Sequence, residues 1–307
     1  MSAPVVIAVV LAVLLLIASV LLVLELLRKP ADRSRVAAPP VVTGPAATDE
    51  VDRALRVLVT ACDRAGRDFP DVYAVEVAAD RVVLRLTTFE PEAPEPWVSR
   101  GDGTEWTLGR AGRQTGAQVA AESHPYPLVV SLGLREDRRV LVNLARAAGP
   151  VSLTGQPESV GPVVRQMLTE LLTGPVGRDA EVVLTGRTAT ELAGQLAGAR
   201  PGRLRTAPTL AEARHSGLEQ PAGRAAATSV FQQLDDGRAA AEPDQPRRLV
   251  VIDAEQFRAE SAGRPATGGA VLVLGEVDHA AWRFEVRPDG SVDTGALGLT
   301  VHTVRLG

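Results

Sequence analysis

Lysine is almost absent from this chain. Lys29 is the only lysine among 307 residues, and the other basic residues are arginines. A lysine Schiff base and the phosphate-binding lysine of a phosphate loop are therefore both excluded from any site that follows residue 29.

Cysteine and aromatic residues are scarce as well. Cys62 is the only cysteine, which excludes an intramolecular disulfide and a cysteine metal cluster. It shares one apolar helical face with Val51, Leu55, Leu58 and Val59, so we expect a buried structural thiol rather than a nucleophile. Aromatic residues make up 3% of the chain and the formal net charge is −4. This composition is not that of a nucleic-acid-binding surface, and we expect no nucleic-acid partner.

Catalytic and metal-binding motifs are also missing. The four histidines are scattered without metal-ligand spacing, and no serine stands in a G-x-S-x-G turn. Gly268-Gly269 precedes an expected strand instead of following one, unlike a dinucleotide-binding fingerprint. We therefore predict no catalytic, cofactor-binding or metal-binding residues and no cofactor. The histidines are His124, His215, His279 and His302.

One long apolar run stands near the N-terminus. Residues Val5–Leu24 carry no charge and are rich in Val, Leu and Ile. As a helix this run would be about 30 Å long, which matches the hydrocarbon thickness of a bilayer. A cleaved signal peptide would have a basic start and a shorter apolar core. We therefore predict a retained transmembrane anchor over residues 1–28, with the lipid bilayer as its partner.

The charges that flank this run predict its orientation. Arg28, Lys29, Arg33 and Arg35 follow the run, and no charged side chain precedes it. Because positive residues stay on the cytoplasmic side, we expect a single-pass protein of the cell membrane whose C-terminal domain is cytoplasmic.

A linker and a small α+β unit are expected next. Residues 29–48 are rich in Pro and Ala without any period, which predicts a flexible tether. The unit spans residues 49–125. It should contain a helix that Thr48 or Asp49 caps and Gly66 ends, a hairpin over 73–86, and a second small hairpin between Trp97 and Trp106.

Residues 126–307 alternate between expected strands and helices, which predicts an α/β domain with a largely parallel sheet covered on both faces. The strand Arg248–Asp253 should lie centrally, beside the strand Val151–Thr154. The expected strands are 128–134, 140–144, 151–154, 181–185, 204–207, 248–253, 270–274, 282–286 and 299–306, and the expected helices are 157–172, 188–196, 209–216 and 222–241.

The stretch VSLGLREDRRVLVNLARAAGPVSLTGQPESVGP, residues 130–162, resembles the entry to the motor domain of FtsK-type DNA translocases and type VII secretion ATPases. Leu132-Gly133, Asn143-Leu144 and Val151–Gly155 follow the order and spacing of that family. Arg248–Asp253 resembles its acidic strand. The resemblance covers about half of the chain and implies a P-loop (ASCE) ATPase fold in a membrane-anchored protein of actinobacterial type.

The phosphate loop itself departs from the family pattern. In G-x-x-x-x-G-K-[ST], backbone amides cradle the phosphates, lysine neutralises them and the hydroxyl holds magnesium. Counting from Gly155, Val160 stands at the second glycine, Gly161 at the lysine and Pro162 at the hydroxyl. We therefore expect Gly155–Gly161 to keep the shape of a phosphate loop without binding phosphate.

Asp253 and Glu255 occupy the region where the family holds magnesium and a catalytic base. An acid at the end of an apolar strand more often caps the next helix, and we expect that role here.

These features predict a membrane-anchored, catalytically inactive P-loop-like scaffold or regulatory protein that acts on an unknown protein partner. The alternative is a nucleotide-binding or motor subunit that a neighbouring protein completes. A third possibility is an extracellular cell-wall module on an inverted anchor.

Overall fold

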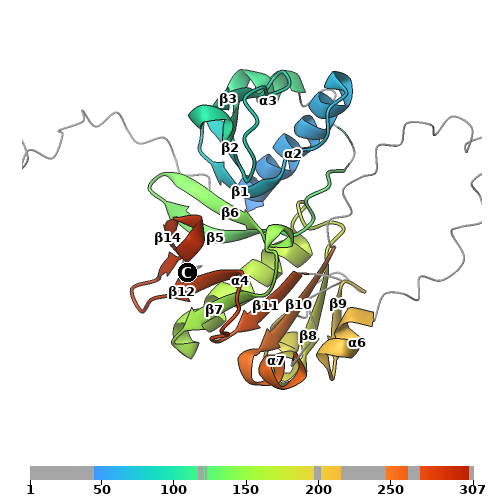
Figure 1. The fold of residues 1–307 in the computed structure, drawn as a ribbon, viewed down its shortest axis with the longest axis vertical. Helices are drawn as coiled ribbons and strands as arrows, with labels where there is room; N and C mark the ends of the chain where they lie inside the picture. Colours follow the sequence, from blue (N-terminus) through green and yellow to red (C-terminus); the bar gives the residue numbers. More distant parts are fainter. Residues whose placement is uncertain are drawn as a thin grey trace, which may run out of the picture. The chain divides into compact units, whose positions relative to one another are not determined.

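The computed structural model describes residues 45–116, 121, 123–196, 202–215, 247–261 and 270–303. These residues form a mixed α/β fold around one large mixed sheet (Figure 1). The expected membrane helix, the linker up to residue 44 and the expected helix 222–241 lie outside them. Among the described residues, no helix has both the length and the apolar character needed to cross a membrane.

The first described helix, α2, spans Pro45–Ala65. It begins before the predicted caps Thr48 and Asp49, because proline fits the first turn of a helix. It ends as predicted at Gly66, which has the positive φ of +60° that a helix C-terminus favours. Cys62 is buried, as predicted, on the apolar face that α2 turns toward the sheet.

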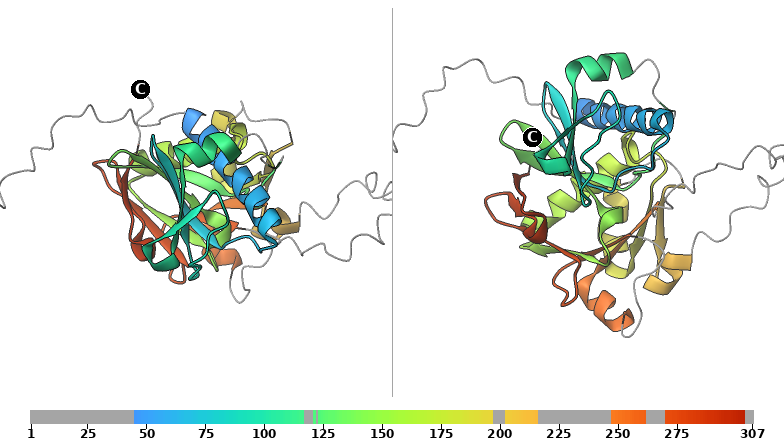
Figure 2. Two further views of the ribbon diagram at one scale, coloured as in Figure 1. Left: turned by 90° about the horizontal axis from the view of Figure 1, so that it is seen from above. Right: turned by 45° about the horizontal axis from the view of Figure 1, so that its top comes forward.

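Two small hairpins follow α2, as predicted. Strands β1 (Val72–Val77) and β2 (Arg81–Leu86) pair in antiparallel fashion, and β4 (Glu105–Gly109) pairs with β2 and with β3 (Val98–Arg100). A 3-10 turn, η1 (Gly101–Gly103), joins β3 to β4. Figure 2 shows α2 along one face of these strands. Helix α3 (Arg110–Gly116), which the sequence pattern did not predict, packs against α2.

The sheet continues across the predicted boundary at residue 125. Strands β5 (Val129–Arg135) and β6 (Arg138–Asn143) form the predicted hairpin, and β6 also pairs with β1. A 3-10 turn, η3 (Leu144–Arg146), follows β6. The described residues belong to one compact unit, and the division into two domains stays a prediction.

The C-terminal strands extend the antiparallel part of the sheet. Strand β12 (Trp282–Val286) pairs with β13 (Ser291–Asp293), which pairs with β14 (Thr300–His302), and β14 joins β5. The predicted last strand, 299–306, is shorter among the described residues, which end at Thr303. Strand β13 and the turn η6 (Gly295–Leu297) were not predicted.

Six strands form the parallel part of the sheet in the order β12-β7-β11-β10-β8-β9. Their predicted ranges agree with the structure to within a residue. These strands are β7 (Val151–Gly155), β8 (Glu181–Thr185), β9 (Leu204–Ala207), β10 (Arg248–Asp253) and β11 (Ala270–Leu274), together with β12.

Helices cover both faces of this parallel part, as predicted. On one face lie α4 (Pro157–Thr173), α5 (Gly186–Leu192) and the turn η4 (Ala193–Leu196); on the other lie α6 (Leu210–His215) and α7 (Ala254–Glu260). Each face of the parallel part has its own hydrophobic core, because side chains alternate along β10. Leu249 and Val251 point to the face that α4 and α5 cover, and Val250 and Ile252 point to the face that α6 and α7 cover.

Two features of the predicted sheet are wrong. The sheet is mixed rather than largely parallel, because every pairing from β3 to β12 is antiparallel. Strand β10 is not beside β7, because β11 lies between them and pairs with both. Strand periodicity reports which residues are buried, but it does not report which strand is the neighbour.

A buried carboxylate joins three strands of the antiparallel part. Glu76 on β1 is fully buried, and it accepts hydrogen bonds from Arg85 on β2 and from Arg138 on β6, the latter at 3.0 Å. Arg85 also donates to Glu105 on β4 at 2.7 Å. Burial alone would raise the pKa of Glu76, but the hydrogen bonds and charges of Arg85 and Arg138 outweigh it and hold the pKa below its ordinary value of 4.5.

Because its pKa is lowered, Glu76 makes the stability of the fold depend on pH in the acid range. A carboxyl whose pKa is lower in the folded state stabilises the fold above its unfolded pKa, and this stabilisation is lost as pH falls through the folded pKa. We expect Glu76→Gln to lower the free energy of unfolding by about 1–3 kcal/mol at pH 7. The difference from wild type should shrink as pH falls below about 4.5, measured by urea unfolding across pH.

The matched control is Glu105→Gln, since Glu105 binds the same arginine from a partly exposed position. Glu105→Gln should lower the free energy of unfolding by less than Glu76→Gln does at pH 7. A difference between Glu76→Gln and wild type that stays constant down to pH 3 would contradict this assignment.

Candidate functional site

The carboxyl ends of the parallel strands are where an open α/β sheet binds its ligands, in the loops that lead to the following helices. In this chain those connections are almost absent. Helix α5 begins directly after β8, and α7 directly after β10. A single residue, Gln156, separates β7 from α4. The edge therefore offers little irregular backbone to surround a ligand.

The prediction that Gly155–Gly161 keeps the shape of a phosphate loop is wrong. Helix α4 starts at Pro157, so the residues that would wrap around a phosphate are already helical. The physical reason is that proline at the first helical position fixes φ near the helical value and promotes an immediate start. Pro162, in the next turn, is also accommodated within the helix.

The first turn of α4 also lacks the amides that an anion needs. Pro157 has no N–H, and the amides of Ser159 and Val160 both donate to the carbonyl of Gln156 at 2.9 Å. The remaining amide belongs to Glu158, whose carboxylate repels a phosphate. Helix N-termini bind anions through unpaired amides and the helix dipole, and this one retains little beyond the dipole.

Gly155 is required by packing rather than by a ligand. Its φ is +142°, and a Cβ added there would lie 2.3 Å from the carbonyl oxygen of Val286 on β12. By contrast, a Cβ added at Gly161 would have nothing within 4 Å. The two glycines at the ends of the predicted loop therefore have different environments: Gly155 packs against β12, and Gly161 lies within α4 with free space beside it.

Hydroxyl groups near this edge are occupied by the main chain. Ser152 donates to the carbonyl of Gly275 at 2.7 Å, Thr154 to that of Phe284 at 3.2 Å, and Thr185 to that of Val251 at 3.3 Å. These hydroxyls tie neighbouring strands together.

Asp253 caps α7, as expected from its place at the end of an apolar strand. Its Oδ1 accepts a hydrogen bond from the amide of Gln256 at 2.9 Å. Glu255 lies in the exposed first turn of the same helix. Neither acid faces a phosphate loop, because none is formed at the end of β7.

Two other residues named in the sequence analysis, Cys62 and His124, lie in environments that favour a structural role. Burial raises the pKa of the Cys62 thiol to about 12, so the reactive thiolate is suppressed. His124 lies against Asp52 on α2, with its Nε2 3.5 Å from Oδ1 of that residue, and its Nδ1 accepts from the amide of Tyr126. In the described residues, no group of His, Cys, Asp and Glu is arranged to hold a metal ion.

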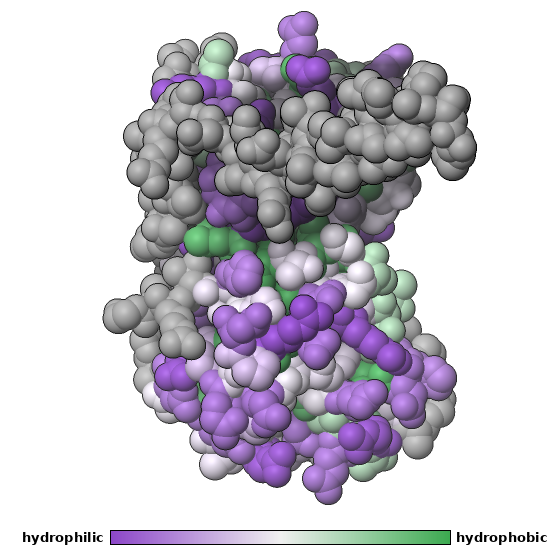
Figure 3. Space-filling model, turned by 90° about the vertical axis from the view of Figure 1, so that its left-hand side faces the viewer, coloured by the Kyte–Doolittle hydropathy of each residue, from purple (hydrophilic) through white to green (hydrophobic). Residues whose placement is uncertain are grey.

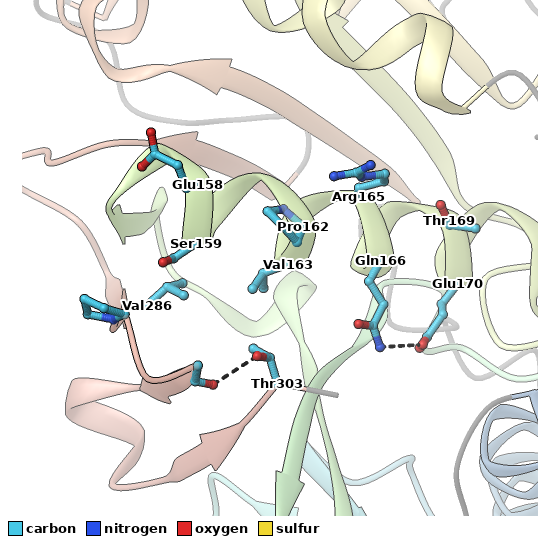
Figure 4. A pocket seen from close by; sticks show the side chains of 12 residues that line it. Glu158, Ser159, Pro162, Val163, Arg165, Gln166, Thr169, Glu170, Val286 and Thr303 are labelled. Carbon is cyan, nitrogen blue, oxygen red and sulfur yellow. Dashed lines mark hydrogen bonds between the residues drawn. The ribbon is translucent and has the colours of Figure 1, made fainter. Parts of the chain in front are cut away.

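A groove of about 550 Å³ lies beside α4 and was not predicted (Figure 4). One wall is the flank of α4 from Glu158 to Glu170, and the other is formed by Val286, Pro288, Gly290 and Thr303. Figure 3 views the side of the molecule that carries β12 and β14, and it shows a patch of apolar surface above a mostly hydrophilic region. The sequence did contain a sign of this groove. Three polar residues, Ser159, Gln166 and Glu170, recur at helical spacing along one flank of α4.

A buried ion pair closes one end of this groove. Arg139 on β6 is almost fully buried, and it donates to Glu170 on α4 and, at 2.8 Å, to the hydroxyl of Ser131 on β5. Gln166 donates to the same Oε1 of Glu170 at 3.1 Å (Figure 4). The other carboxylate oxygen, Oε2, is buried and has no hydrogen-bond partner among the described residues.

Comparison with known proteins gives no relative from which to transfer a function. No protein-family model matches the chain, and no curated protein matches it. The functional proposal therefore depends on the geometry described above and on the resemblance of residues 130–162.

Proposed function

We propose that this chain is a membrane-anchored scaffold or regulatory protein whose P-loop-like domain is catalytically inactive and acts through protein–protein contacts. The observation that carries the proposal is the junction from β7 to α4, where one residue replaces a phosphate loop. A domain of this kind can present surfaces to a partner while having no means to hold a nucleotide.

The strand order supports the P-loop-like part of this proposal. Strand β11 lies between β7, which would carry the phosphate loop, and β10, which ends in Asp253, while β12 flanks β7 on the other side. The ASCE class has an additional strand between the phosphate-loop strand and the acidic strand, and β11 occupies that position here. This order supports the proposed likeness of the parallel part to that class.

The expected absence of nucleotide binding has a simple energetic basis. Micromolar affinity requires about 8 kcal/mol of binding free energy. The dipole of α4 supplies only about 0.3–1 kcal/mol at an exposed site. Lysine is absent from this region, and Glu158 adds a negative charge at the helix start. The remaining free energy would have to come from groups that this chain does not place near the junction.

Calorimetry tests this conclusion. We expect the full chain in detergent micelles to show no binding of ATP or GTP at millimolar concentration, with or without magnesium. A micromolar dissociation constant would contradict the inactive-fold proposal and favour the alternative of a nucleotide-binding subunit.

The anchor part of the proposal rests on the uncharged run Val5–Leu24 and the basic residues that follow it. It places the folded domain on the cytoplasmic side of a cell membrane.

Reporter fusions test this orientation. A fluorescent protein fused to the C-terminus should be bright, and alkaline phosphatase at the same position should be inactive. Active phosphatase together with a dark fluorescent fusion would reverse the topology and favour the extracellular alternative.

A further inference from the structure

The loop that connects β2 to the edge strand β3 is exposed, acidic and rich in proline (Figure 1). Residues 89–98 read Phe-Glu-Pro-Glu-Ala-Pro-Glu-Pro-Trp-Val. Among the described residues, the large hydrophobic side chains that are exposed are Phe89, at 67% exposure, and Val98, at 50%. Both stand at the ends of this one loop. Exposed apolar side chains that gather on one segment, rather than being scattered singly, indicate an interaction surface.

The surroundings of Phe89 hold its ring in a defined place. A Cβ added at Gly103 would lie 3.0 Å from Cε2 of Phe89, so the ring lies against the turn η1. The amide of Glu90 donates to the carbonyl of Gly103 at 2.8 Å. The carbonyl of Glu90 accepts from Nε1 of Trp106 at 2.9 Å and from the hydroxyl of Ser99 at 3.4 Å. The exposed ring is therefore carried by a fixed backbone.

The middle of the loop is fixed as well. Arg67, which follows α2, donates to the carbonyl of Glu92, and the amide of Trp97 donates to the carbonyl of Pro94 at 2.9 Å. Pro94 is buried, and Ala93 packs against the core between α2 and the strands. Proline also restricts the backbone by fixing φ. A surface that is ordered in advance loses little conformational freedom when it binds.

The charge of the loop indicates what kind of partner it fits. Glu90 pairs with Arg67, with 3.7 Å between carboxylate and guanidinium. The exposed Arg100 on β3 adds one further positive charge. Three other acids are exposed and have no ion pair with a described residue: Glu92, Glu95 and Asp102. A partner with basic side chains is therefore complementary, whereas the negative surface of a cytoplasmic leaflet is not.

We propose that residues 89–98 form a docking loop for a protein partner that has an apolar pocket for Phe89 and arginine or lysine side chains beside that pocket. Phe89 is the apolar anchor, because aromatic side chains are enriched in the buried cores of protein interfaces. Glu92 and Glu95 orient the partner and disfavour acidic competitors. The proposal rests on the proposed function in one respect, that the chain acts through protein–protein contacts.

Photocrosslinking at the anchor position tests this proposal. In the full chain, expressed in cells of its natural host, Phe89 is replaced by p-benzoylphenylalanine. Its light-excited ketone takes a hydrogen atom from a nearby C–H bond and then joins to that carbon. We expect one discrete protein adduct, which mass spectrometry identifies. The same photoreactive residue at His279, which is exposed in the loop after β11, should give no such adduct.

Calorimetry with the purified partner then separates specific docking from chance capture. Phe89→Ala should weaken the affinity at least about tenfold, because it removes the apolar anchor. Glu92→Lys/Glu95→Lys should weaken it about fivefold or more, because like charges then face each other.

The matched control is Glu276→Lys/Asp278→Lys, which reverses two exposed acids with the same spacing in the loop after β11. It should leave the affinity unchanged. Both double variants should unfold at the urea concentration of the wild type, since the four side chains are exposed.

Three outcomes would overturn the docking loop. The first is equal affinity of the two double lysine variants. The second is a Phe89 adduct with lipid or with a second copy of this chain in place of a partner protein. The third is a protein adduct at His279 and none at Phe89, which would leave the proposed function standing on another surface. Micromolar nucleotide binding, by contrast, would contradict the proposed function, and a charge-dependent adduct at Phe89 would still support the docking loop.

Discussion

The close approach of Gly155 to the carbonyl of Val286 determines how the parallel part of this protein is built. At this point β7 ends against β12, and the chain enters α4 after one further residue. A side chain at Gly155 would meet backbone 2.3 Å away, so the contact allows only glycine in this conformation. After one intervening residue, Pro157 begins the helix. The packing of Gly155 and the early helix start at Pro157 together leave no loop between β7 and α4 in which a phosphate would bind.

Helix α4, which starts at this junction, contacts both the parallel and the antiparallel part of the sheet. Its apolar face packs against one face of the sheet, and its other flank forms one wall of the groove. Near its end, Glu170 holds the buried guanidinium of Arg139 and so links α4 to β6 of the antiparallel part. A buried charge of this kind is costly unless it is paired. One helix thus joins the two parts of the sheet.

Much of this fold could be predicted from the sequence, because the burial of strands and helices imposes a periodic pattern of apolar residues on it. The strands that correspond to β7, β8, β10 and β11 were predicted to within a residue, since continuous apolar runs indicate strands buried on both faces. Strand neighbours were not predictable, and the insertion of β11 between β7 and β10 depends on contacts between distant segments. The phosphate-loop shape was predicted wrongly because a motif alignment counts residues and ignores that Pro157 begins a helix. The groove was missed because one wall comes from α4 and the other from residues more than 100 positions later.

The central claim is that the glycine at the β7–α4 junction serves packing and that the residues after it are helix. Urea unfolding of Gly155→Ala and Gly161→Ala tests it most directly. Gly155→Ala should lower the free energy of unfolding by about 2–4 kcal/mol, because the new Cβ meets the Val286 carbonyl in a strained conformation. Gly161→Ala should raise it by about 0.5–1 kcal/mol, because alanine is favoured over glycine inside a helix and has free space there. A Gly161→Ala variant that is as destabilised as Gly155→Ala would contradict the account, since it would place Gly161 in a loop that requires glycine.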